Sequence, residues 1–349
     1  MNNLGPDYFA RAATRAAVRV LICTALALAL LATGCGRGKG RSGKPMVFVS
    51  IPPQAYFVKR VAGDLVEVEV LVPAGQDPHT YSPTAQQMVR LEHAAALFRI
   101  GVPFETALVN RIAAASPNLR VVDTNAGLAP EEALQEDERE HAAEPQAAQA
   151  GLDPHTWLSP RLVRGQAAVI AQTLEKIDPG HAELYAANLG QFQAELDELD
   201  KLIAQTLEPV RGGTFYVFHP AFGYFAKAYG LHQEAVEWEG KSPSPRRLTE
   251  LVAQARAKGV RTIFIQPQLS QRPVRTVADA IGAQVSTLND LSPDYMNNML
   301  DIAHKIRDAL LPPEFVLATR PVPRRRPASA AATQEAATAT APATQGGPP

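Results

Sequence analysis

The sequence predicts an α/β protein of two lobes, each built on a parallel sheet flanked by helices, with one long helix joining them. Three observations lead to this fold class. Short runs of β-branched and apolar residues alternate with segments of helical spacing, which is typical of parallel sheets covered by helices. This alternation occurs twice along the 349 residues, and a long amphipathic segment separates the two sets. With 46% hydrophobic residues, the chain has enough apolar material for one or two packed domains.

The first lobe is expected over residues 45–180. Strands are predicted where β-branched and apolar residues cluster, and helices where apolar residues repeat with a helical period. The expected strands are residues 46–51, 66–72, 97–100 and 119–122, and the expected helices are residues 53–62 and about 83–93.

One long helix is predicted over residues 181–209, between the lobes. Asp178-Pro179 supplies a cap and first-turn signal before it, and Pro209 follows its end. A helix of roughly 28 residues is ~42 Å long, which is enough to run along both lobes. The periodicity alone is also compatible with an ordinary amphipathic helix inside a single domain. The apolar residues recur at spacings of 4, 3, 4, 3 and 4, and they are Tyr185, Leu189, Phe192, Leu196, Leu199 and Ile203.

The second lobe is expected over residues 210–313, on the same principle as the first. Its predicted strands are residues 215–218 and 262–265. Two predicted helices begin near residues 221 and 273, and two others cover residues 245–258 and 295–310. Two further segments are expected to be solvated and without a fold of their own. They are the acidic loop at residues 129–150 and the Ala/Thr/Pro-rich tail at residues 314–349.

Residues 1–34 are interpreted as a secretory signal peptide. A positive segment with three arginines precedes an apolar run at 20–32, which is too short to span ~30 Å of hydrocarbon. The run ends in Leu31-Ala32-Thr33-Gly34-Cys35, which resembles a bacterial lipobox whose cysteine becomes the lipid-carrying first residue. Residues 35–44 are therefore expected to form a lipidated, flexible tether. The alternative is an uncleaved anchor in which Cys35 has no role.

Composition excludes several other classes of protein. The formal charge of −1 and the absence of a basic, aromatic-rich module argue against a nucleic-acid partner. The two cysteines, Cys23 and Cys35, both lie in the first tenth of the chain. They therefore exclude a disulfide framework and a thiolate metal site in the body, so that any metal chemistry there uses nitrogen and oxygen ligands.

A repeated phrase contains the first candidate functional residues. The chain has Asp77-Pro78-His79-Thr80-Tyr81-Ser82-Pro83 and later Asp153-Pro154-His155-Thr156-Trp157-Leu158-Ser159-Pro160. Asp-Pro keeps the backbone extended before the histidine, and Ser-Pro favours the start of a helix, so each histidine is expected on a short rigid loop. Asp77 and Asp153 are expected to orient the two imidazoles.

A third histidine, His219, follows the first predicted strand of the second lobe. In open α/β sheets, ligands bind beyond the carboxyl ends of the strands, where His219 is expected. Each of the three histidines by itself is compatible with a purely structural loop residue. Their shared kind of position predicts a metal site in the cleft between the lobes, because neutral imidazole is a common metal ligand.

The motifs around these histidines resemble a known family over about residues 46–310. The phrases DPHTYSP, DPHTWLSP, HPAFGYFAKAYGL, GKSPSPRRL and IFIQPQLS are similar to those of the ZnuA-like solute-binding proteins of zinc and manganese ABC importers. The resemblance implies two lobes on a rigid helix, with one metal bound between them. It implies His79 and His155 as ligands from the first lobe and His219 from the second. Manganese-binding relatives carry Glu in place of His219, so the third imidazole indicates zinc.

Two departures from the family pattern concern the remaining ligand. Gln266 stands where relatives commonly have Glu, and Asn289-Asp290-Leu291 stands where they have Asp-Pro-Leu. We expect Asp290 to be the fourth ligand, with a water molecule as the alternative. Gln266 and Asn289 are expected to support the ligands from behind.

The predicted function is extracytoplasmic capture of Zn2+ by a lipid-anchored, monomeric protein that delivers the metal to the permease of an ABC importer. Imidazole nitrogens favour Zn2+ over Mn2+, and three of them suit tetrahedral zinc. We expect no enzymatic activity. The alternatives are a manganese-binding importer component, a surface metal-binding adhesin, and a three-histidine zinc hydrolase. Against the hydrolase, the sequence has no HExxH segment and no evident general base beside the histidines.

Overall fold

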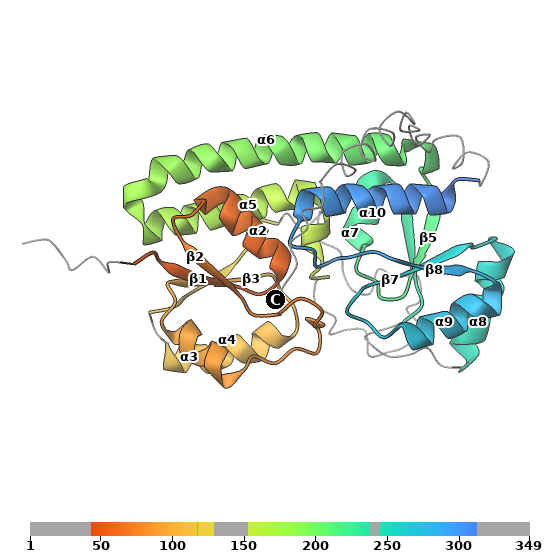
Figure 1. Cartoon of the computed structure of the whole chain (residues 1–349), viewed down its shortest axis with the longest axis horizontal. Coiled ribbons are helices and arrows are strands. Elements are labelled where there is room, and N and C mark those ends of the chain that lie inside the picture. The colour runs from red at the N-terminus through yellow and green to blue at the C-terminus, as the bar shows by residue number, and fades with distance from the viewer. Residues whose placement is uncertain (1–42, 117, 129–152, 238–244, 313–349) are drawn as a thin grey trace, which may run out of the picture.

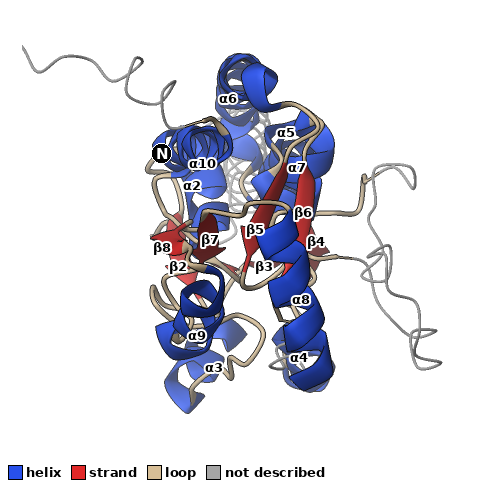
Figure 2. Ribbon diagram, turned by 90° about the vertical axis from the view of Figure 1, so that its right-hand side faces the viewer, coloured by secondary structure: helices blue, strands red, loops and turns tan. Residues whose placement is uncertain are grey.

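A computed structural model of the chain describes residues 43–116, 118–128, 153–237 and 245–312. Two sheets of four parallel strands lie within these ranges, and helices cover both faces of each sheet (Figures 1 and 2). This arrangement confirms the predicted fold class. The expected signal peptide, Cys35, the acidic loop at 129–150 and the tail at 314–349 lie outside the described residues.

The first sheet has the strand order β2-β1-β3-β4. Its strands are β1 (Met46–Val49), β2 (Glu67–Val70), β3 (Ala96–Arg99) and β4 (Arg120–Asp123), and its helices are α2 (Pro52–Ala62), α3 (Ala85–Glu92), α4 (Phe104–Ala115) and α5 (Pro160–Ile177). All four strands form where the sequence predicts them. Helix α4 was not predicted, although Phe104, Leu108 and Ile112 are buried four residues apart and give it a helical apolar face.

The second sheet repeats this topology, with the strand order β6-β5-β7-β8. Its strands are β5 (Thr214–Val217), β6 (His232–Ala235), β7 (Thr262–Ile265) and β8 (Gln284–Thr287), and its helices are α7 (Gly223–Tyr229), α8 (Pro245–Ala257), α9 (Gln271–Ile281) and α10 (Tyr295–Leu310). The prediction missed β6 and β8. Both are edge strands with mixed polar sequences, and main-chain pairing with β5 and β7 rather than an apolar run makes them strands.

The long helix predicted between the lobes is α6 (Ala182–Leu207), with 26 residues. It lies along both lobes (Figure 1), packing on α2 and α5 of the first and on α7 and α10 of the second. Five of the six periodic apolar residues are buried in it, and Leu189 is half-buried. The alternative of a helix confined to one domain is therefore excluded. Within the described ranges, no helix is both long and apolar enough to cross a membrane.

The helix starts predicted from the Ser-Pro pairs differ in detail. Pro160 occupies the first turn of α5 as predicted, but the Ser159 side chain makes no capping hydrogen bond. Helix α3 begins two residues later than Ser82-Pro83 indicates. There Thr84 is the cap, because its hydroxyl accepts from the Gln87 N–H at 3.2 Å while the Gln87 side chain accepts from the Thr84 N–H at 2.9 Å.

One apolar core connects the lobes. It extends from the first sheet through α2, α5 and α6 to α10 and to Phe215 and Val217 of β5. Tyr295 of α10 packs edge-on against Phe57 of α2, with ring centroids 4.9 Å apart. A smaller second core lies between β7 and helices α8 and α9. The lobes are therefore joined by buried side chains as well as by the chain itself.

Candidate metal centre

Three histidines from three loops meet between the two sheets. The Nε2 atom of His155 lies 3.2 Å from Nε2 of His79 and 3.3 Å from Nε2 of His219. Among the described residues, these three form a group whose ligand atoms all lie within 4.8 Å of one another. Two nitrogens bound to one tetrahedral Zn2+ at 2.0–2.1 Å are about 3.3 Å apart, so the cluster has the dimensions of a zinc site.

His79 lies on the loop between β2 and α3, as the first repeated phrase predicts. The Asp77 Oδ1 atom accepts a hydrogen bond from the His79 main-chain N–H at 2.9 Å, and Oδ2 accepts one from the Thr80 hydroxyl at 3.3 Å. Asp77 therefore shapes the backbone of this loop. Its predicted role of orienting the imidazole itself stays a prediction.

His155 lies directly before a short 3₁₀ turn, η2 (Thr156–Leu158), and is 3% exposed. Its Nδ1 lies 2.7 Å from Asp153 Oδ1, which also accepts from the His155 main-chain N–H at 2.9 Å. The buried carboxylate thus contacts both the ring and the backbone of the same histidine. This geometry agrees with the orienting role expected for Asp153.

His219 follows β5, at the carboxyl edge of the second sheet as predicted. Its Nδ1 lies 2.6 Å from Oε1 of Glu237, a nearly buried residue that follows β6. Glu237 was not predicted as a site residue, because β6 itself was not predicted. The signal that would have found it is its place just past a strand that neighbours β5.

The two carboxylates determine which ring nitrogens face the cluster centre. A carboxylate accepts hydrogen bonds, so the neutral tautomer that satisfies these two contacts has its proton on Nδ1. In the neutral imidazole, Nε2 then presents a lone pair. Lone pairs facing each other at 3.3 Å repel unless a cation lies between them, so the arrangement suits a metal ion.

Asp290, the expected fourth ligand, follows β8 and is 4% exposed. Burial raises the pKa of its carboxyl group, while the Gln268 side chain and nearby His155 and His219 act in the opposite direction. Gln268 Nε2 donates to Oδ1 and Oδ2 of Asp290 at 3.0 and 3.3 Å. Asp290 lies close to the histidines but outside their compact group. Gln268 was not predicted as a site residue.

The two other predicted supporting residues contact the backbone of the ligand loops. Asn289 Oδ1 accepts from the Leu291 N–H at 3.0 Å, so its side chain closes a turn. Gln266 is 1% exposed and donates through Nε2 to the His219 carbonyl at 3.0 Å. Gln266 thus holds the loop that carries His219.

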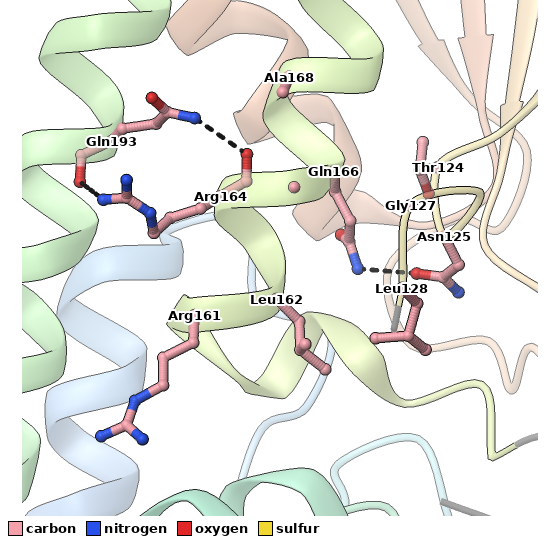
Figure 3. Close-up of a pocket in the computed structure, with 11 residues that line it drawn as sticks. Thr124, Asn125, Gly127, Leu128, Arg161, Leu162, Arg164, Gln166, Ala168 and Gln193 are labelled. Carbon is pink, nitrogen blue, oxygen red and sulfur yellow. Dashed lines mark hydrogen bonds between the residues drawn. The ribbon is translucent and has the colours of Figure 1, made fainter. Parts of the chain in front are cut away.

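A polar network beneath the second ligand loop borders a separate cavity of about 330 Å³ (Figure 3). Asn125 and Gln166 line this cavity, and the Gln166 Nε2 atom donates to Asn125 Oδ1 at 3.1 Å. The Thr156 hydroxyl also donates to Asn125 Oδ1, at 2.9 Å, and lies 3.0 Å from Gln166 Nε2. None of the three histidines lines the cavity. It lies instead beside Asn125 and Gln166, the side chains that contact Thr156.

Comparison with known proteins agrees with this geometry. The chain is 29% identical to the high-affinity zinc uptake system protein ZnuA of Bacillus subtilis (strain 168) over 254 residues, covering 72% of this chain and 80% of that protein. It is 31% identical to the protein of the same name from Paracoccus denitrificans (strain Pd 1222) over 279 residues, covering 73% and 85%. A crystal structure of ZnuA matches with a TM-score of 0.70 and 38% identity, covering 77% of this chain and all of that one.

The family profile described as the periplasmic component A of the zinc-uptake complex, ZnuA, matches residues 47–309. This span includes the long helix, all three clustered histidines and, except for Met46, both sheets. The chain therefore belongs to the ZnuA family.

Proposed function

We propose that this protein captures Zn2+ outside the cytoplasm and delivers it to the permease of an ABC importer, as a solute-binding protein without enzymatic activity. The observation that carries the proposal is the cluster of three Nε2 atoms, two of them oriented by carboxylates on Nδ1. The zinc-uptake relatives support the same function, because their names describe uptake rather than catalysis.

In this proposal His79, His155 and His219 are the zinc ligands, and Asp290 or a water molecule completes a roughly tetrahedral site. The nitrogen-rich set favours Zn2+ over Mn2+. Because the ion is the transported cargo, the site has to bind it reversibly as well as tightly. A single protein chain supplies all the clustered histidines, so the proposed site needs no second copy of the chain.

Titration calorimetry tests the assignment. We expect one tightly bound Zn2+ per chain and displacement of Mn2+ by Zn2+ in competition. The triple variant His79→Ala, His155→Ala, His219→Ala should lose the tight site. His181→Ala is a matched control, since its Nδ1 also lies 2.7 Å from a carboxylate, that of Asp178, but it lies at the start of α6 outside the cluster. A tight site retained in the triple variant, or preferential Mn2+ binding, contradicts the proposal.

The attachment to the membrane is proposed from the N-terminal sequence. Cleavage before Cys35 and lipidation of its thiol would anchor the protein through residues 35–44. In a bacterial host, the parent protein should partition with membranes and the Cys35→Ala variant should not. Equal membrane association of the two proteins contradicts lipidation at Cys35.

A further inference from the structure

The loop that carries His155 precedes the long helix in sequence, but it is hydrogen-bonded to the second lobe at both ends. At the first end, the Tyr224 hydroxyl of α7 donates to the Asp153 carbonyl at 3.1 Å. At the other end, the Tyr295 hydroxyl of α10 donates to the Trp157 carbonyl at 2.8 Å. The Trp157 indole N–H donates in turn to the carbonyl of Asp290 at 2.6 Å.

All of these groups are buried. Trp157, Tyr224 and Tyr295 are at most 3% exposed, and Asp153 is 4% exposed. In such an environment, a carbonyl that loses its donor is left without water to replace it, which makes the loss costly. The bonds therefore hold the loop in one position against the second lobe.

Each tyrosine is hydrogen-bonded to a residue whose side chain contacts His155. The carboxylate of Asp153, whose carbonyl is bonded to Tyr224, contacts Nδ1 of His155. The ring of Trp157, whose carbonyl is bonded to Tyr295, lies with its centroid 5.1 Å from that of the His155 ring. His219, the next ligand, lies on the second lobe, to which the two hydroxyls tie the loop.

We propose that Tyr224 and Tyr295 are positioning residues of the metal centre. Their hydroxyls fix the two ends of the segment 153–157 against the second lobe and so keep Nε2 of His155 at bonding distance from the metal shared with His219. The separation of these two ligands then does not depend on how the first sheet is oriented relative to the second. This inference rests on the proposed zinc function of the cluster.

The test compares Tyr224→Phe, Tyr295→Phe and the double variant with a matched control, Tyr185→Phe. Tyr185 is also buried, and its hydroxyl donates one part-buried hydrogen bond, to Asp178 Oδ2 at 2.8 Å, near the start of α6 and outside the histidine cluster. All four variants remove one or two hydroxyls and keep the aromatic rings. Differences between them therefore report the place of the hydrogen bond rather than a change in packing.

Two measurements separate positioning from simple stability. The rate at which Zn2+ passes from each loaded protein to an excess of chelator should rise about tenfold or more in the double variant, and less in each single variant. The visible absorption of the Co2+-loaded protein, which reports ligand geometry, should change in the same order. Tyr185→Phe should lower the unfolding midpoint of the metal-free protein about as much as each of the single variants Tyr224→Phe and Tyr295→Phe does. It should leave both metal readouts unchanged.

If the parent binds zinc and the double variant matches Tyr185→Phe in dissociation rate and Co2+ spectrum, the positioning role is overturned while the proposed function stands. If the parent itself binds no zinc, both fail. The single variants keep the test valid if the double variant does not fold.

Discussion

Two histidines of the cluster, His155 and His219, obtain their carboxylate partners in different ways. Asp153 is two residues from His155, so a local turn brings the carboxylate to the ring. Glu237 is 18 residues from His219 and reaches it only because β6 pairs with β5. In both cases the carboxylate contacts Nδ1, which leaves Nε2 facing the cluster.

Glu237 should therefore matter for metal binding although it lies outside the three-histidine cluster. In Glu237→Ala, His219 loses the group that orients its ring, and the Zn2+ affinity should fall about 10–100-fold. Glu237→Gln retains an acceptor and should fall less. The affinity is measured by competition with a chelator, with the exposed Glu198→Gln as control. Parent-like affinity of Glu237→Ala contradicts the role.

Asp290 and its neighbour Asn289 differ in what their side chains can offer the metal. If Asp290 supplies the fourth ligand, Asp290→Ala removes the carboxylate beside the histidines and should weaken Zn2+ binding by more than about tenfold. Asn289→Ala should weaken it less, because this side chain closes a turn at Leu291. Zinc titrations of the two variants decide the question, and a silent Asp290→Ala leaves water as the fourth ligand.

At the scale of the elements, the chain segments after the strands are held by side chains from neighbouring elements. Glu105, in the first turn of α4, is 1% exposed and accepts from the N–H groups of Ile100 and Gly101 at 2.9 and 2.7 Å, just after β3. Gly101 has φ of +102°, a conformation that favours glycine. In the same manner, Asn125 holds Thr156, the residue after His155, and Gln166 in turn donates to Asn125.

Glu105 gives stability a pH dependence of known sign. Burial raises the pKa of its carboxyl above its ordinary value of 4.5, despite the hydrogen bonds that act to lower it. At a pH between the pKa of Glu105 in the unfolded state and its higher pKa in the folded state, the folded state binds more protons. The contribution of Glu105 to the free energy of unfolding is therefore complete below about pH 4.5 and is lost as the pH rises through the folded-state pKa. Between pH 4.5 and 7, the free energy of unfolding measured in urea should decline less in Glu105→Gln than in the parent protein. Parallel pH curves for the two proteins contradict the prediction.

At the scale of the whole molecule, α6 and α10 each pack against elements of both lobes and hold the two lobes together. Helix α6 packs on helices of both lobes (Figure 1), and the core of buried side chains beneath it continues from β1 to β5. Tyr295 contributes to the core of the first lobe through Phe57 and to the His155 loop through its hydroxyl. A large hinge motion would have to break these buried contacts, so the fold suits a site with a nearly constant shape.

Unfolding should therefore be cooperative across both lobes. Phe192 on α6 is fully buried, with its ring centroid 6.1 Å from that of Phe57, and Phe192→Ala should lower the free energy of unfolding by about 3–5 kcal/mol. Leu202→Ala on the same helix should change it by less than about 0.5 kcal/mol, because Leu202 is 41% exposed. Circular dichroism and tryptophan fluorescence should give coincident transitions in denaturant. Separate transitions for the two probes contradict a shared core.

Local sequence determined the parts of the protein that depend on neighbouring residues. The apolar periods located α6, α10 and most strands, because each helix or strand buries one face of its own residues. The two Asp-Pro-His phrases and the place of His219 after a strand identified the clustered histidines, since turn chemistry and parallel-sheet geometry are local rules. The ZnuA resemblance followed from these same motifs.

Tertiary structure decided what depends on partners far along the chain. Edge strands β6 and β8 exist through main-chain pairing with β5 and β7, which leaves little side-chain pattern in their own sequences. Trp157 meets the Asp290 carbonyl across 133 residues, and Tyr295 meets the Trp157 carbonyl across 138. Any buried tyrosine or tryptophan can donate one hydrogen bond, so its residue type does not specify the acceptor. Only the packing of one lobe against the other selects these acceptors and places His155 beside His219.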